Sequence, residues 1–409
     1  MLSSFTEPVA QHSGTVQPRG TTMSKAAAGQ LIALDSELYQ QGLAQFEQNI
    51  GLLLATYQQA QIPVYIGTLA SNEADQPPFQ SEPELAFVPD PGSKSAEQEL
   101  PLLLKQHPQH ALLHFNYGLW LRQQGQTTAA LTEFQWARDL DLLRFRAPSA
   151  FNPLIRRLAE QHQAVLVDTE STLRMHSKDQ LLGQQLLLEH VHPNAQGYFL
   201  MAQAYLEQLI RSGVLPKPAT EWRSQNIAAD MPLTRVDLLL ADYKIRQLKA
   251  FYPFSQHNHS QNKLPDFGPR PDKEHQLAYQ RSQGLSWLDA SQQLLEYYQK
   301  QQQVAEAAKV AGLLFDSLPD QHQAAYVAGQ LYFVAEDLAL AIYYQRRALA
   351  LGKEPLNDRM ALARSYFFAG KLSDAIELLQ QVLKLDPQHQ AAQQQLQRLS
   401  ALQHQQRSK

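Results

Sequence analysis

A glutamate and a histidine three positions apart are the side chains of this 409-residue chain best suited to acid–base chemistry. They lie in residues 188–198, where Glu189 precedes His192, Pro193 and Asn194 follow, and an apolar helical pattern begins. A loop histidine acts as a general base when a carboxylate fixes its tautomer, so this pair has the form of the orienting half of a hydrolytic triad. The alternative is a histidine with a purely structural role.

Two short apolar runs are expected to form the strands that position this loop. The run at 62–69 follows a helical pattern over residues 34–61, and the run at 164–168 follows a second helical pattern over 152–162. A short β-branched run after a helix is typical of a buried strand in a parallel sheet. The sequence therefore predicts an α/β arrangement around the glutamate–histidine loop.

Three further polar residues are expected beside His192. Ser71 and Asn72 lie in the loop that leaves the first predicted strand at its carboxyl end, the edge where open α/β sheets bind ligands. Asn194 precedes the last helix predicted for this part of the chain and is expected to cap it, and Gly213 is in the position that usually ends a helix. We expect Ser71, Asn72 and Asn194 to line a cleft.

Residues 92–145 interrupt the α/β pattern. Counted from Ala111, this segment fits one tetratricopeptide (TPR) unit of 34 residues. The fit depends on small and aromatic residues at the expected positions, namely Tyr117, Gly118, Leu121, Gly125, Ala130, Phe134 and Ala137. The small side chains at Gly118 and Ala130 allow two helices to pack closely. The segment is therefore predicted to be an inserted helical hairpin, either a lid over the cleft or a surface for a partner.

The last third of the chain, residues 281–409, repeats at an interval of 34 residues. The interval separates alanines, tyrosines and inter-repeat turn residues, namely Ala307, Ala341 and Ala375, then Tyr298, Tyr332 and Tyr366, then Pro319, Lys353 and Pro387. Gly329 and Ala363 occupy the small position, where Leu295 is a departure in the first repeat. Three units in register predict an all-α TPR solenoid, which presents a concave groove to a protein or peptide partner.

The remaining segments are polar. Residues 1–30 are expected to be disordered or a loop, and residues 214–280 are expected to be a linker with one helix at 235–250. His257 and His259 in this linker have a spacing that can bind a metal adventitiously. No third histidine or carboxylate follows at ligand spacing, so we favour a solvated loop.

The composition narrows the classes of function. A net charge of −4 and a pI near 6.4 give no reason to expect nucleic acid or an acidic membrane surface as partner. The absence of cysteine excludes thiol chemistry, disulfides and cysteine-ligated zinc. No run approaches the roughly 18 apolar residues that a membrane span needs, and residues 1–25 lack the charged-then-apolar order of a signal peptide. A soluble protein is expected, and its compartment stays open.

The glutamate–histidine block resembles the last conserved block of SGNH (GDSL-type) hydrolases, usually Asp-x-x-His-Pro, with Glu189 in the acidic place. Residues 39–79, residues 137–146 and the strand end at 167–168 also resemble SGNH proteins that carry TPR units. The resemblance covers about residues 25–250.

This resemblance implies a flavodoxin-like three-layer α/β domain over residues 31–91 and 146–213, interrupted by the TPR hairpin and followed by the all-α TPR solenoid. It also implies hydrolysis or transfer of an acyl ester, with a carbohydrate or lipid ester as substrate. His192 would be the general base and Glu189 its orienting acid. That chemistry needs no metal or organic cofactor.

The nucleophile of the SGNH family is missing from the sequence. The family places a serine in a Gly-Asp-Ser-Leu-like turn and an oxyanion donor in a Gly-x-Asn block, and neither block occurs here. Ser3 and Ser4 have no strand before them and no glycine elbow. Three explanations stay open: a fragment of a longer protein, which we favour, complementation by another polypeptide, or a degenerate hydrolase kept for its TPR surface. The alternative function is therefore a non-catalytic TPR scaffold or adaptor.

Overall fold

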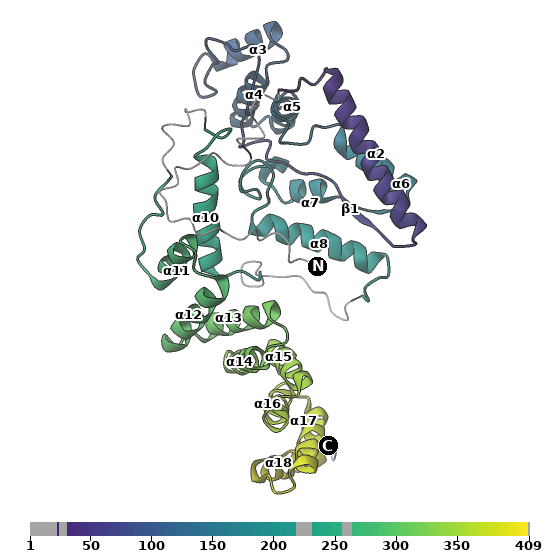
Figure 1. Cartoon of the computed structure of the whole chain (residues 1–409), viewed down its shortest axis with the longest axis vertical. Helices are drawn as coiled ribbons and strands as arrows, with labels where there is room; N and C mark the ends of the chain where they lie inside the picture. Colours follow the sequence, from purple (N-terminus) through teal and green to yellow (C-terminus); the bar gives the residue numbers. More distant parts are fainter. Residues whose placement is uncertain (1–22, 24–30, 218–230, 256–263, 408–409) are drawn as a thin grey trace. The chain divides into compact units, whose positions relative to one another are not determined.

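Helices make up most of the structure (Figure 1). The computed structural model describes residues 23, 31–217, 231–255 and 264–407. Within these residues the ordered elements are helices apart from two short strands. The structure is therefore mainly helical, and its strands are fewer and shorter than a three-layer α/β domain over residues 31–91 and 146–213 would contain.

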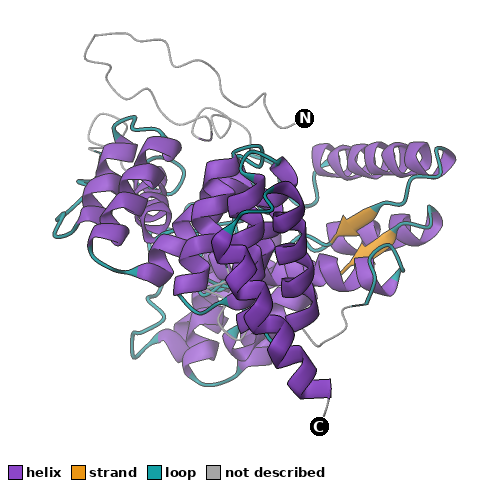
Figure 2. Ribbon diagram, turned by 90° about the horizontal axis from the view of Figure 1, so that it is seen from below, coloured by secondary structure: helices purple, strands orange, loops and turns teal. Residues whose placement is uncertain are grey.

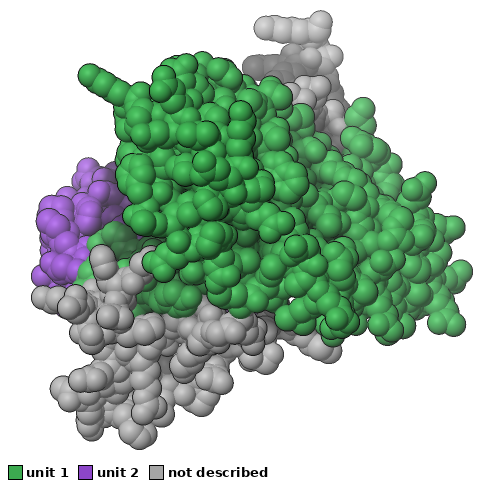
Figure 3. All heavy atoms as spheres, turned by 90° about the horizontal axis from the view of Figure 1, so that it is seen from above, with its two compact units in different colours: residues 1–231, 245–265 green, residues 232–244, 266–409 purple. Residues whose placement is uncertain are grey.

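The chain divides into two compact units, drawn in green and purple in Figure 3. Unit 1 comprises Met1–Met231 and Ile245–Pro265. Unit 2 comprises Pro232–Lys244 and Asp266–Lys409. The glutamate–histidine loop and the inserted hairpin belong to unit 1, and the C-terminal repeats belong to unit 2.

A two-stranded parallel sheet lies at the centre of the α/β part of unit 1 (Figure 2). Its strands are β1 (Tyr65–Gly67) and β2 (Val165–Val167), with Tyr65 opposite Val165 and Gly67 opposite Val167. On one face it is covered by α2 (Glu37–Gln59) and α6 (Phe151–Gln161). The apolar cluster on this face includes Leu43, Phe46, Ile50, Leu54, Ile66, Leu154 and Leu158. The α2 members recur at helical spacing, so one stripe of that helix turns inward.

The other face of the sheet meets α8 (Ala195–Arg211), which Asn194 caps by accepting a hydrogen bond from the Gly197 amide at 3.0 Å. Gly213 follows the end of α8 with a φ of 78°, so the predicted cap and stop are both confirmed. The short helices α7 (Thr169–Met175) and η1 (Lys178–Gln180) precede it. The cluster on this side consists of Leu173, Leu182, Leu186, Leu187 and Leu200.

The predicted sheet is wrong in extent. Both strands form where the apolar runs predicted them, but each is three residues long, shorter than 62–69 and 164–168. Among the described residues β1 and β2 pair only with each other, so hydrogen bonding cannot extend the strands beyond their shared register. A three-layer SGNH-type domain is therefore not seen in the described part of the chain.

The inserted segment forms α3 (Ala96–Gln106), α4 (Ala111–Gln123) and α5 (Thr127–Asp139). α4 and α5 make the predicted hairpin, and α3 is an additional helix. The close approach depends on Gly118, because a Cβ there would lie 2.8 Å from Cε1 of Phe134. The small residue therefore has the packing role that the sequence predicted.

Unit 2 contains a run of helical hairpins. Its helices are α11 (Lys273–Ser282), α12 (Trp287–Lys300), α13 (Val304–Ser317), α14 (His322–Val334), α15 (Leu338–Leu351), α16 (Pro355–Phe368), α17 (Leu372–Leu385) and α18 (Gln390–Arg407). Successive hairpins pair α12 with α13, α14 with α15, and α16 with α17. Their starts are separated by about one 34-residue repeat, as the sequence predicted.

The segment expected to be a linker also contains packed structure. It holds α10 (Arg235–Lys249) and most of α11. Val236, Tyr243 and Phe267 are buried in the same apolar cluster as Leu294 and Tyr298 of the first repeat. This part of the linker therefore contributes to the core of unit 2, while His257 and His259 lie outside the described residues.

Gly329 in α14 offers a test of the repeat packing. A Cβ at this position would lie 2.5 Å from Cγ and 3.1 Å from the amide nitrogen of Gln345, which is itself buried. We expect Gly329→Ala to lower the free energy of unfolding by about 1–2 kcal/mol, because overpacking outweighs the gain in helix propensity. Urea unfolding followed by circular dichroism measures the change.

Gly42 in α2 is the matched control, because nothing lies within 4 Å of a Cβ added there. Gly42→Ala should leave stability unchanged or raise it by up to about 1 kcal/mol. Equal effects of the two substitutions would contradict the close packing of α14 on α15.

Candidate functional site

The Glu189 carboxylate is the centre of the candidate site. Its side chain is fully buried, and it accepts hydrogen bonds from the backbone amides of His190 at 2.6 Å, Val191 at 3.3 Å and His192 at 3.0 Å. It also contacts Nδ1 of His192. Glu189 and His192 are therefore in contact. The same carboxylate accepts hydrogen bonds from three successive backbone amides and so fixes the conformation of the loop.

His192 is exposed where Glu189 is buried. Its side chain is 61% exposed, and Nδ1 is held by the carboxylate. Within the described part of the chain Nε2 has no hydrogen-bond partner. An imidazole whose Nδ1 is fixed in this way presents Nε2 as a base, which is the arrangement that general-base catalysis needs.

The surroundings of Glu189 favour its ionised form. Burial raises the pKa of this carboxyl, but hydrogen bonds and charge from His190 and His192 outweigh burial and lower the pKa to about 2. The carboxylate therefore stays charged at neutral pH.

His190 is a second histidine beside Glu189, and the sequence patterns did not point to it. It is buried, and its Nδ1 lies against Glu189. The rings of Phe79, Phe145 and Phe254 surround its imidazole at 5.5 to 6.0 Å between centroids. Glu189 thus lies between one buried and one exposed histidine. The Glu-His-Val-His order was the available signal, but only the outer histidine fits the Asp-x-x-His spacing.

The loop after β1 lies beside the Glu189 loop. The amide of Asn72 donates to the carbonyl of His190 at 2.9 Å, and Arg146 donates to the carbonyl of Asn72 at 2.9 Å. Ser71 and Asn72 are both buried. The Asn72 side chain accepts from the amide of Asp75 at 3.0 Å, so its amide group shapes the loop.

The side chain of Asn194 is also hydrogen-bonded to the backbone of the fold. Besides capping α8, it donates from Nδ2 to the carbonyl of Gln185 at 2.8 Å. The structure therefore brings Asn72 and Asn194 to the loops around His192, but both amides are bonded to backbone groups.

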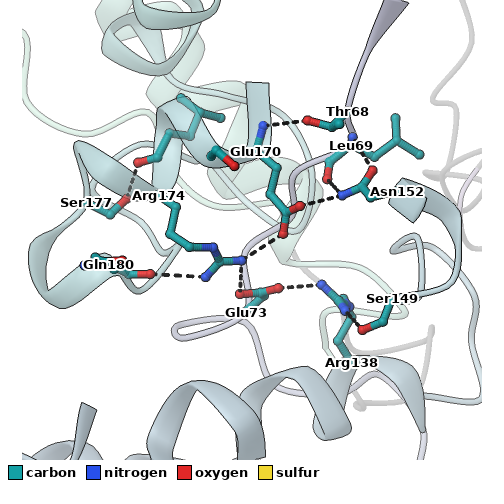
Figure 4. Close-up of polar contacts among 12 residues, drawn as sticks. Thr68, Leu69, Glu73, Arg138, Ser149, Asn152, Glu170, Arg174, Ser177 and Gln180 are labelled. Atoms are coloured by element: carbon teal, nitrogen blue, oxygen red, sulfur yellow. Dashed lines mark hydrogen bonds and ion pairs between the residues drawn. The ribbon is translucent and has the colours of Figure 1, made fainter. Parts of the chain in front are cut away.

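A buried ion-pair network supports this region (Figure 4). Glu73 lies between Arg138 of α5 and Arg174 of α7, with 3.0 Å to Arg174. Arg174 also pairs with Glu170 at 3.0 Å, and Asn152 donates to Glu170 at 2.7 Å. The network joins the inserted hairpin to the loop after β1. Charges this far apart in the sequence gave no local signal of their pairing.

A groove of about 430 Å³ lies between α12, α13 and α14 in unit 2. Its lining is apolar or amide, with leucines such as Leu288 and Leu318 and glutamines such as Gln292 and Gln323. Among the residues that the structure describes, no charged side chain lines it. Such a surface can bury apolar side chains while its amides donate to and accept from a peptide backbone.

The described residues also bear on metal binding and on membrane insertion. No three histidine, aspartate or glutamate side chains come together there as metal ligands would. In the same residues, no helix combines the length and apolar character that crossing a bilayer requires.

A sequence family covers the repeats. The model of the family described as "Anaphase-promoting complex, cyclosome, subunit 3" matches residues 300–382, from the end of α12 into α17. Residues 287–385 form three TPR repeats. The prediction of a C-terminal TPR array is confirmed by this match together with the helical hairpins in their 34-residue register.

Solved TPR structures are distantly similar to the chain. The first TPR domain of Spaghetti (RPAP3), bound to an HSP90 peptide, has 21% identity and a TM-score of 0.26, covering 29% of this chain and 95% of its own. YrrB, described as a TPR protein with an unusual peptide-binding site, has 10% identity and a TM-score of 0.26, covering 73% and 97%. The P58(IPK) TPR domain has 12% identity and a TM-score of 0.28, covering 72% and 65%.

No curated protein matches the sequence. None of the matches named above is to an SGNH hydrolase, so they give the expected resemblance over residues 25–250 no support. At these TM-scores, the solved structures carry no argument about what this chain binds.

The low pKa of Glu189 makes the stability of unit 1 depend on pH. Because the folded-state pKa is about 2 against an ordinary 4.5, the contribution is present above pH 4.5 and is lost as pH falls towards 2. We expect Glu189→Gln to lower stability at pH 7 by on the order of 3 kcal/mol and to flatten the acid limb of the curve. Thermal unfolding at a series of pH values measures both.

Glu160 provides the control carboxylate, since it is exposed on α6. Glu160→Gln should reproduce the wild-type pH curve. A Glu189→Gln curve parallel to that of the wild type would show that the carboxylate is not held in its charged form.

Proposed function

We propose that this protein is a scaffold whose TPR repeats bind an extended segment of a partner protein. The observation that carries the proposal is the groove of about 430 Å³ between α12, α13 and α14, which the described residues line with apolar and glutamine side chains and no charged one. Leucines accept apolar side chains of a ligand, and glutamines pair with its backbone. The open-ended stacking of repeats makes such surfaces accessible to an extended chain.

Gln323 tests this groove, because its exposed side chain lines it without contributing to the core. A phage-displayed library of random 12-residue peptides, selected on the full chain, should yield binders with Kd values that fluorescence anisotropy can measure. We expect Gln323→Arg to weaken them by about tenfold or more, since a charge is placed among apolar contacts.

Gln380 on α17 is the matched control, an exposed glutamine outside this groove. Gln380→Arg should change the Kd by less than about twofold. A selection that enriches no peptide would contradict the proposal.

Unit 1 supports a second candidate function, hydrolysis or transfer of an acyl ester. The favouring observation is the buried Glu189 that holds Nδ1 of the exposed His192. In this candidate His192 is the general base and Glu189 the orienting acid, and Ser71, Asn72 and Asn194 belong to the cleft walls. The nucleophile is a serine that this sequence does not supply, and the substrate is a carbohydrate or lipid ester.

In this candidate, the additional strands of the α/β domain would pair at the edge of the sheet beside β1. Among the described residues β1 pairs only with β2, and α2 exposes Leu52, Leu53 and Tyr57. An additional parallel strand beside β1 would cover apolar surface of this kind and would end at the same edge as the loop after β1. In this candidate the inserted hairpin is a lid or a partner surface for the α/β part.

Labelling with a fluorophosphonate probe separates the two candidates. One labelled serine at about one probe per chain, read by intact mass and peptide mapping, would show a complete triad in this chain and overturn the absence of the nucleophile. His192→Ala should lose this label, whereas His176→Ala, which removes another exposed histidine, should keep it. If no serine is labelled in the folded protein, this chain by itself is not the hydrolase, and peptide binding remains as its function.

A further inference from the structure

An aromatic patch with one arginine joins the first helices of two successive TPR repeats. Phe333 of α14 and Phe368 of α16 meet edge to face at 5.4 Å between ring centroids. The guanidinium of Arg364 lies 4.1 Å above the ring of Phe333 and donates to Gln330 at 2.6 Å. We call these residues, with Val334, the α14–α16 patch; Figure 1 labels both helices.

The apolar part of this patch is open to solvent. Phe368 is 61% exposed and Val334 is 62% exposed. The core of the third repeat is built from other residues, including Leu362, Ala375 and Leu379. A single exposed apolar residue is ordinary, but a partly exposed aromatic pair, with the exposed Val334 next to Phe333 in the chain, is typical of interaction sites.

Arg364 has no carboxylate partner among the described residues. Its hydrogen bond goes to the neutral amide of Gln330, and its guanidinium lies over the ring of Phe333. By contrast, Arg281 and Arg235 of unit 2 both form ion pairs with carboxylates. A guanidinium held in this way keeps donors for a planar acceptor, and a carboxylate matches it best.

We propose that the α14–α16 patch binds a partner segment in which an aspartate or glutamate lies beside a large apolar or aromatic side chain. The acidic group pairs with Arg364, and the apolar side chain packs on Phe368 and Val334. The proposal rests on peptide binding by the TPR repeats and adds the chemistry of the ligand. The uncharged groove between α12 and α14 then takes a different, neutral part of the same segment.

Peptides selected from the random library on the full chain test this inference. The peptides are synthesised with amidated C-termini, so that only side chains supply a carboxylate. We expect them to share an acidic residue next to phenylalanine, tryptophan, leucine or methionine. Arg364→Gln and Phe368→Ala should each raise the Kd by about tenfold or more.

Two matched variants act as controls. Lys371→Gln removes a positive charge close to the end of α16, but this lysine lies over Tyr366, 5.7 Å from its ring centroid, outside the patch. Leu385→Ala removes an apolar side chain of α17 that is 58% exposed. Both should change the Kd by less than about twofold. Replacing the acidic residue of the peptide by its amide should weaken binding to the wild type and leave the affinity for Arg364→Gln unchanged.

The outcomes distinguish this inference from the proposed function. Peptides that bind and respond to Gln323→Arg, but lack an acidic residue or ignore Arg364→Gln and Phe368→Ala, would overturn the inference and leave peptide binding intact. Peptides that bind only through a free C-terminal carboxylate would also overturn it. A library that yields no binder would overturn both.

Discussion

A buried carboxylate, Glu73, fixes the arrangement of unit 1. It joins Arg138 of the inserted hairpin to Arg174 of α7, and these partners are 65 and 101 residues away in the sequence. The Glu73 side chain is 1% exposed, so loss of both arginines would leave a buried charge unpaired. The hairpin is therefore held against the loops around β1 by charge pairing as well as by apolar packing. The neighbouring Asp141–Arg146 pair at 3.0 Å is buried in the same way.

Unit 2 is organised by a different principle. Its order comes from small residues that let helices approach and from aromatic rings stacked between them, such as Tyr332 on Tyr344 at 5.4 Å. Burial and nearby carboxylates raise the pKa of Tyr332 to about 12, so its hydroxyl stays neutral throughout the physiological range. Each repeat is specified by its immediate neighbours, which is why a repeat interval is visible in the sequence. Unit 1 depends on contacts between residues far apart in the sequence, and no repeat interval indicates those contacts.

This difference explains what the sequence could predict. The repeats and the Gly118 packing followed from residue spacing, and the contact between Glu189 and His192 followed from their separation by three positions. The extent of the sheet did not follow, because strand length depends on neighbouring strands rather than on the apolar run itself. The role of His190, the position of Glu73 and the burial of Phe267 depend on tertiary contacts between distant segments. The hydrolase interpretation remains a proposal for the same reason, since a catalytic site requires a nucleophile and oxyanion donors placed beside the histidine by tertiary contacts.

The stacking of Arg364 on Phe333 has a consequence for how a ligand would associate. An arginine side chain usually loses roughly 2 kcal/mol of rotamer freedom when it is ordered. Here the ring and the Gln330 amide already restrict the guanidinium in the free protein. Association therefore requires little further ordering of this side chain. The Arg364 guanidinium is preorganised in the repeat array, so the affinity for a ligand can come from a few contacts on a small surface.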